Sequence, residues 1–167
     1  MRLFIASPVI IDDYASIKED FKDIIDGKWV EAENLHLTWV FLGDVNNENP
    51  VIAKLKELSP LESQVSIEKL GYFGRPPRVF FAKAEEKALY EKAKQFRNAG
   101  FDLYRFKPHI TLCRIKAIHD YKSYKEKLKF YREKTLGVIL PEINLYESRL
   151  TSKGAEYSCR YTIEGLA

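Results

Sequence analysis

The chain has 167 residues, of which 46% are hydrophobic and 31% are charged, and it carries a formal net charge of +3. This balance is typical of a soluble globular protein and excludes a disordered chain. The longest apolar runs fall far short of the roughly 18–20 residues that a membrane span needs, so a transmembrane protein is also excluded. The mild positive charge is compatible with an anionic partner but does not identify one. The length predicts a single domain of two lobes, residues 1–167.

The N-terminus and the cysteines both favour a cytoplasmic protein. The short apolar run at residues 3–6 is soon followed by Asp12 and Asp13, so we interpret it as a first strand and not as a secretion signal. Two cysteines, Cys113 and Cys159, are too few for a disulfide framework. We expect both of them to be buried free thiols.

The hydrophobic pattern predicts alternating helices and strands along the chain. Apolar residues at steps of three and four from Ile10 to Ile25 predict an amphipathic helix that ends near Gly27. Strict alternation from Leu35 to Phe41 predicts a strand. The later segments predict helices at about 49–59, 85–99 and 121–131, the second of which ends at Gly100. They predict strands at about 65–67, 79–81, 110–113, 143–150 and 157–163. A Gly- and Pro-rich loop is expected at 71–77 and a hairpin turn at 152–154.

One short pattern occurs twice. His-Leu-Thr-Trp stands at residues 36–39 and His-Ile-Thr-Leu at 109–112, and each copy lies on a predicted strand that follows a helix. The repeat indicates an internal duplication with two equivalent strands. Because helices and strands mix without a strict βαβ rhythm, the pattern favours an α+β fold of antiparallel strands.

The repeated pattern places acid–base chemistry on one face of each strand. Residues i and i+2 of a strand point the same way, so His36 lies beside Thr38 and His109 beside Thr111. If the two strands meet, one neutral histidine can take a proton from a nucleophile and one protonated histidine can give a proton to a leaving oxygen, which suits displacement at phosphorus. A single His-x-Thr pattern usually marks only a half-solvated strand face. Two copies that use two of the three histidines favour catalysis, whereas His119 is expected at a solvated helix start.

Other chemistries fit the sequence less well. Histidines 36, 109 and 119 together with Cys113 contain metal-ligating atoms, but their spacing forms no ligand motif. The chain has neither a Gly-x-Ser-x-Gly elbow nor a phosphate-binding Gly-x-x-x-x-Gly-Lys loop. We therefore expect non-covalent catalysis without a metal or another cofactor.

The motifs and their flanks resemble the RNA 2′,3′-cyclic phosphodiesterase family, whose members are also called 2′-5′ RNA ligases and belong to the two-histidine phosphoesterases. The resemblance rests on Glu-Asn-Leu-His-Leu-Thr at 33–38, Phe-Leu-Gly-Asp-Val at 41–45, Gly-Tyr-Phe at 71–73, Pro-Arg-Val at 77–79 and Phe-Lys-Pro-His-Ile-Thr-Leu-Cys-Arg at 106–114. It extends from Arg-Leu-Phe-Ile-Ala at 2–6 to the segment at 145–154, and so covers nearly the whole chain.

The resemblance implies two antiparallel sheets related by a pseudo-twofold axis, with helices outside and a central cleft. It makes His36 the proton donor to the leaving 3′ oxygen and His109 the acceptor that activates water, which leaves a 2′-phosphate. Thr38 and Thr111 would bind phosphate oxygens, and a 5′-hydroxyl in place of water would give the reverse ligation. The implied partner is RNA with a 2′,3′-cyclic phosphate end, such as a tRNA fragment, or a nucleotide, with no membrane partner and with the protein acting as a monomer.

Two phosphate-binding positions depart from the family or stay open. Many relatives have Arg at the position of Lys107. Lysine binds a phosphate through a single charged ammonium group, whereas the guanidinium group of arginine can donate two parallel hydrogen bonds. Arg114 matches a recurrent family position, yet strict alternation places it on the side of Ile110. Either the strand bulges or ends before Arg114, or this residue braces the structure and does not touch the substrate.

Basic and aromatic residues are candidates for RNA contacts. The basic candidates for the cleft rim are Arg75, Arg78, Arg105, Lys107 and Lys116, although exposed charges are usually only solvated. Tyr72 and Phe73 are candidates for stacking on a base, whereas we expect Phe41 to pack in the core. Two rival functions remain, namely a phosphodiesterase acting on a cyclic phosphate of a nucleotide or ADP-ribose, and a binding module without turnover.

Overall fold

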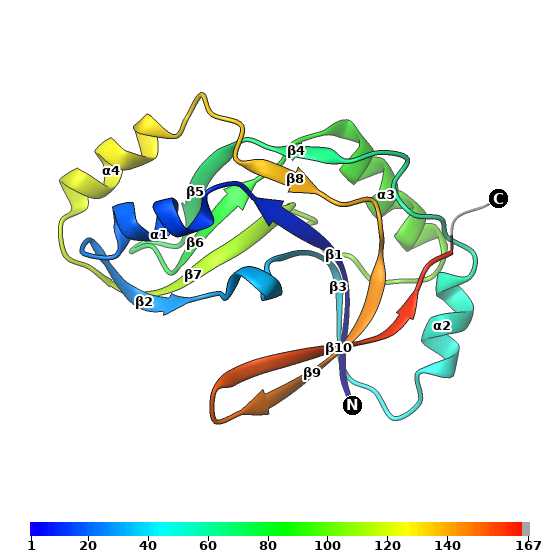
Figure 1. Cartoon of the computed structure of the whole chain (residues 1–167). Helices are drawn as coiled ribbons and strands as arrows, with labels where there is room; N and C mark the ends of the chain where they lie inside the picture. The colour runs from blue at the N-terminus through cyan, green and yellow to red at the C-terminus, as the bar shows by residue number, and fades with distance from the viewer. Residues whose placement is uncertain (165–167) are drawn as a thin grey trace.

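The computed structural model describes residues 1–164 and shows the predicted α+β fold (Figure 1). The helices are α1 (Tyr14–Phe21), the 3-10 helix η1 (Ala32–Asn34), α2 (Asn49–Leu55), α3 (Lys87–Asn98) and α4 (Tyr121–Phe130). The strands are β1 (Arg2–Ile11), β2 (Ile25–Trp29), β3 (His36–Asp44), β4 (Val65–Ile67), β5 (Lys69–Phe73), β6 (Val79–Lys83), β7 (His109–Ile118), β8 (Gly137–Ile139), β9 (Asn144–Thr151) and β10 (Gly154–Thr162).

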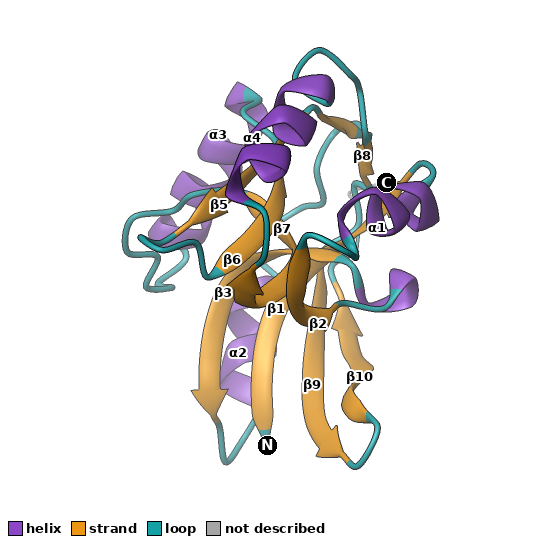
Figure 2. Cartoon of the chain, turned by 90° about the vertical axis from the view of Figure 1, so that its left-hand side faces the viewer, coloured by secondary structure: helices purple, strands orange, loops and turns teal. Residues whose placement is uncertain are grey.

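The strands form two antiparallel sheets, as predicted. In the first sheet β1 lies between β3 and β9, β10 pairs with β9, and the far end of β1 continues through β8 to β4. The second sheet has the order β2-β7-β6-β5. Figure 2 shows the strands β3, β1, β9 and β10 side by side in the lower half and the second sheet above them. The two strands with the repeated motif, β3 and β7, belong to different sheets and pack against each other.

The helices cover the outer faces of the two sheets. Phe21 of α1 packs on Phe80 of β6 with ring centroids 4.7 Å apart, and Tyr124 of α4 contacts both rings. Trp39 of β3 stacks on Phe96 of α3 at 5.5 Å. These contacts lie on the faces of the strands opposite His36 and His109.

The helix predicted between Ile10 and Ile25 is much shorter than expected. Strand β1 continues to Ile11, Asp13 adopts a left-handed conformation with φ of 51°, and helix α1 ends at Phe21. Ile25 already belongs to β2, an edge strand that the pattern did not predict. The prediction was wrong because apolar residues at the end of one strand and the start of another happen to continue the helical spacing.

The predicted loop at 71–77 contains part of a strand. Strand β5 continues to Phe73, and a Cβ at Gly71 would lie 2.9 Å from the ring of Phe81. Gly71 is therefore present because an aromatic ring covers its backbone, and not because the chain turns there. The short strand β8 was also missed.

The other helices and the hairpin confirm the sequence pattern. Helices α2, α3 and α4 lie within the predicted segments, although α2 ends four residues early at Leu55. Gly100 follows α3 with φ of +100°, a conformation that glycine adopts without strain. The turn between β9 and β10 consists of Ser152 and Lys153, as expected. Among residues 1–164, no helix is long and apolar enough to cross a membrane.

The two cysteines differ in burial. Cys113 is buried in β7, which lies between β2 and β6, and burial raises the pKa of its thiol to about 12. Cys159 is exposed, which corrects the prediction that both thiols are buried. The reason is its position on β10, which is the outermost strand of the first sheet and pairs only with β9.

Candidate active site

The two motif histidines have the same local environment at the first residues of β3 and β7. The Nδ1 atom of His36 lies 2.7 Å from the carbonyl oxygen of Asn34, and the Nδ1 atom of His109 lies 2.7 Å from that of Lys107. A carbonyl oxygen only accepts, so Nδ1–H donates in both contacts. The Nε2 atom of each neutral ring is then free to exchange protons.

The environment of His36 lowers the pKa of its imidazole. Burial lowers the pKa of His36, the hydrogen bond to Asn34 opposes this effect, and the charge of His109 lowers the pKa further. The interaction between the rings agrees with the packing of β3 against β7. Because the lowered pKa lies below the ordinary value of about 6.5, His36 is mainly neutral at neutral pH without a ligand.

The threonines share the histidine faces, as the alternation predicts. Thr38 and Thr111 are half-buried, whereas Leu37 and Ile110 on the opposite faces have no exposed surface. In the second sheet Thr111 pairs with Phe81 of β6. Each strand therefore presents an imidazole and a hydroxyl on one side and apolar packing on the other.

Matching β-bulges follow the two motifs. Ile5 pairs with Val40 but Ala6 pairs with Thr38, so Trp39 is an extra residue in β3. In the other strand Phe80 pairs with Cys113 but Phe81 pairs with Thr111, which makes Leu112 the extra residue. A bulge reverses the alternation of the residues that follow it. The two copies of the motif thus share this irregularity as well.

The bulges decide where Phe41 and Arg114 lie. Arg114 lines a cavity next to His36, because the bulge moves it from the Ile110 side to the histidine side of the strand. The prediction of a bulge before Arg114 is therefore confirmed. Phe41 lines the same cavity and is 75% exposed, so the prediction that it packs in the core was wrong. The physical reason is that Val40 takes the buried position that alternation assigns to Phe41.

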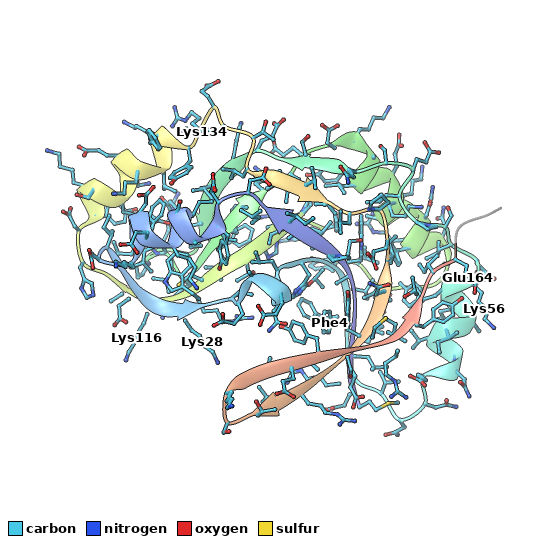
Figure 3. All side chains as sticks on the ribbon, viewed as in Figure 1. Phe4, Lys28, Lys56, Lys116, Lys134 and Glu164 are labelled. Carbon is cyan, nitrogen blue, oxygen red and sulfur yellow. The ribbon has the colours of Figure 1, made fainter. Side chains whose placement is uncertain are left out.

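The cavity beside His36 has a volume of about 460 Å³ and lies between the β9–β10 hairpin and β2. Figure 3 shows Phe4 between η1 and β10. The ring of His36 lies 5.1 Å from the ring of Phe4 and 5.5 Å from that of Tyr157. The lining residues are Arg2, Leu3, Phe4, Lys28, Trp29, Val30, Glu31, Asn34, His36, Phe41, Gly43, Arg114, Ser148, Leu150, Lys153, Gly154, Ala155 and Tyr157.

His109 has its own aromatic neighbours outside this cavity. Its ring meets that of Phe73 edge to face at 4.9 Å and lies 5.7 Å from that of Phe81. The ammonium group of Lys107 lies 6.0 Å from the Phe73 ring. Lys107 therefore lies on the His109 side, where its carbonyl oxygen orients the imidazole and its charge is exposed.

The remaining basic and aromatic candidates lie away from the cavity. Arg75, Arg78, Arg105 and Lys116 are exposed and do not contribute to its lining within residues 1–164. Tyr72 packs against Tyr124 and contacts Lys125 of α4, so it belongs to the helix-covered face of the second sheet. Phe73 alone of the predicted stacking pair lies next to a catalytic candidate.

The sequence did not reveal several cavity residues. Lys28 lies on the unpredicted strand β2, and Lys153 and Tyr157 belong to the hairpin, which is distant in sequence from both motifs. Phe4 had no distinguishing signal either, because it lies in β1 between the equally buried Leu3 and Ile5. In the part of the chain that the structure describes, no three His, Cys, Asp or Glu side chains gather closely enough to hold a metal ion.

Comparisons with known proteins agree with this architecture. Residues 5–81 match the family described as LigT like phosphoesterase. The RNA 2′,3′-cyclic phosphodiesterase of Methanocaldococcus jannaschii is 36% identical over 94% of this chain and 96% of its own length. The protein of the same name from Aquifex aeolicus is 34% identical over 93% of this chain and 90% of its own.

Solved structures share the fold over nearly the whole chain. A crystal structure of a protein from Thermus thermophilus has a TM-score of 0.73 at 28% identity and covers 98% of this chain and 97% of its own. The structure of Escherichia coli LigT complexed with 3′-AMP has a TM-score of 0.68 at 22% identity, with coverages of 96% and 95%. These findings confirm the resemblance of the motifs and their flanks, and the chain belongs to the RNA 2′,3′-cyclic phosphodiesterase family.

Proposed function

We propose that this protein hydrolyses RNA ends that carry a 2′,3′-cyclic phosphate and leaves a 2′-phosphate, with His36 as the acid and His109 as the base. The observation that carries the proposal is the paired arrangement of the two imidazoles, each held through Nδ1 by a carbonyl oxygen and each with a free Nε2. The names of the Methanocaldococcus and Aquifex relatives, which match over nearly the whole chain, support RNA as the substrate.

The proposed reaction is an in-line displacement at phosphorus. The Nε2 atom of His109 takes a proton from water while the water oxygen bonds to phosphorus. The bond from phosphorus to the 3′ oxygen breaks, and His36 gives its proton to that oxygen. Afterwards His109 releases its proton and His36 takes one up, which restores the starting states. A 5′-hydroxyl in place of water gives a 2′-5′ ligation, in which His109 takes the proton of the 5′-hydroxyl and His36 again protonates the leaving 3′ oxygen.

The charge states fit these roles once the substrate is bound. Free His36 is mainly neutral because burial lowers its pKa. An anionic cyclic phosphate beside the ring favours the imidazolium form, so the substrate itself helps to protonate the acid. Thr38 and Thr111 would donate hydrogen bonds to the phosphoryl oxygens, and Arg114 would stabilise their negative charge. Lys107 would add a further positive charge on the His109 side.

We also propose that the protein acts as a monomer in the cytoplasm and that its catalysis needs no metal ion. Two histidines supply both proton transfers, so the scheme needs no metal-bound water or other cofactor. RNA fragments with cyclic phosphate ends, such as cleaved tRNA, are the proposed source of substrate.

The test uses an RNA oligonucleotide that ends in a 2′,3′-cyclic phosphate, in the presence of EDTA. The wild type should form a 2′-phosphate, and His36→Ala and His109→Ala should each lose about 10²- to 10⁴-fold in rate. Binding of the RNA without turnover by the wild type would support a pure binding module. Turnover of a cyclic phosphate on ADP-ribose but not on RNA would contradict the proposed substrate.

A further inference from the structure

Cationic side chains line the part of the cavity that the proposed chemistry does not use. Besides Arg114, the lining contains Arg2, Lys28 and Lys153, whereas Glu31 is its one acidic residue within residues 1–164. The proposed reaction needs charge only at the cyclic phosphate. The additional cations therefore indicate a second anionic group on the ligand.

Lys28 and Lys153 line the cavity from its two sides, β2 and the β9–β10 hairpin. The ammonium nitrogen of Lys28 lies 3.7 Å from the point that a Cβ on Gly154 would occupy, and Lys153 precedes Gly154 in the hairpin turn. Asn34 of η1 donates a hydrogen bond of 3.3 Å to the carbonyl oxygen of Ala155. This bond ties the hairpin to the chain segment that leads to His36. Figure 3 shows Lys28 extending from β2 toward the side of the β9–β10 hairpin.

The cavity has the size and lining of a nucleoside site between two phosphates. Its volume of about 460 Å³ falls in the range of small-ligand pockets. The rings of Phe4, Phe41 and Tyr157 provide apolar surface for a base, and the ring of His36 lies next to those of Phe4 and Tyr157. If the cyclic phosphate lies at His36, the 5′ carbon of the same ribose is directed toward another part of the lining, where cations are available.

We propose that Lys28 and Lys153 bind the 5′-phosphodiester of the terminal nucleotide, so that the enzyme selects RNA ends over free nucleoside 2′,3′-cyclic phosphates. The inference rests on the proposed function and names its substrate class more narrowly. A nucleoside cyclic phosphate has a 5′-hydroxyl, whereas the last nucleotide of an RNA chain has a charged phosphodiester at this position. Lysine ammonium groups bind such a group as point charges.

The kinetic test compares two substrates that differ only at the 5′ position. Adenosine 2′,3′-cyclic phosphate with a 5′-hydroxyl is compared with the same nucleoside carrying a 5′-methyl phosphate. We expect kcat/KM to be at least about 10-fold higher for the phosphodiester, and this ratio to fall to about 1–3 in the Lys28→Gln, Lys153→Gln double variant. Lys56→Gln removes an exposed charge at the opposite end of the molecule (Figure 3) and should keep the ratio.

A binding test separates this inference from the catalytic proposal. Adenosine 2′,5′-bisphosphate should bind the wild type at least about 10-fold more tightly than adenosine 2′-phosphate, and the double variant should lose this difference. Equal affinities or equal kcat/KM values in the wild type overturn the inference, even if RNA ends are hydrolysed. A lysine-dependent binding preference without hydrolysis supports it and instead contradicts the proposed function.

Discussion

Phe41 and Arg114 occupy the same position relative to the two histidines. Each lies five residues after its histidine, and each is turned into the cavity by a bulge at the fourth residue of the motif. Strict alternation places a residue at this distance on the opposite face. The two motif strands therefore share one geometry and differ in chemistry, because one presents an aromatic ring and the other a guanidinium group. This difference favours a base contact at Phe41 and a phosphate contact at Arg114.

The first prediction concerns stacking of the base on Phe41. Phe41→Ala should raise KM for a cyclic-phosphate oligonucleotide about 5- to 150-fold, because stacking on an aromatic ring contributes about 1–3 kcal/mol per base. Steady-state kinetics check this, and Phe41→Tyr should restore most of the affinity. Phe130→Ala removes another exposed ring, on α4, and should leave KM unchanged. An unchanged KM in Phe41→Ala would show that the base lies elsewhere.

The sequence predicted the motif strands well because their alternation is regular through the threonines. It could not predict the lining of the cavity. Trp39 and Leu112 are ordinary apolar residues in strand patterns, and nothing in their identity marks them as the extra residues of bulges. The position of Lys28 also depends on strand β2, whose pairing with β7 is a long-range contact without a local signal. Long-range register, more than local propensity, limited the prediction of the site.

The second prediction concerns the protonation of His36. Burial is the main cause that lowers the pKa of His36, so the ring should titrate below about pH 6.5 in the free protein. Binding of a phosphate should raise this pKa, because the anion stabilises the imidazolium form. NMR titration of labelled histidine rings measures both values, and His36→Gln assigns the signal. A value above 6.5 in the free protein, or one that inorganic phosphate fails to raise, would argue against the proposed charge states.

The third prediction concerns the contact that anchors the first bulge. The indole N–H of Trp39 donates a 2.9 Å hydrogen bond to the hydroxyl of Ser7, and both residues are buried. Ser7→Ala should lower the free energy of unfolding by about 1–3 kcal/mol, because the indole donor is left buried without a partner. Urea denaturation measures the loss. Ser152→Ala, in the exposed hairpin turn, is the matched control and should change stability by less than about 0.5 kcal/mol.

The fourth prediction concerns the guanidinium group of Arg114. Burial raises the pKa of Tyr157 and the charge of Arg114 opposes this effect, so the guanidinium group acts within the cavity beside His36. The planar guanidinium group can donate hydrogen bonds to two phosphoryl oxygens at once, and the ammonium group of a lysine cannot reproduce this geometry. Arg114→Lys should therefore lower kcat about 10²-fold while the folded state is retained.

Single-turnover hydrolysis of a cyclic-phosphate oligonucleotide measures the effect of Arg114→Lys on the chemical step, and circular dichroism checks the fold. Arg132→Lys makes the same exchange at an exposed position after α4 and should leave the rate unchanged. If Arg114→Lys changed KM with kcat intact, Arg114 would bind the substrate and the transition state equally. Arg114 would then act only in substrate binding, as Phe41 is expected to do.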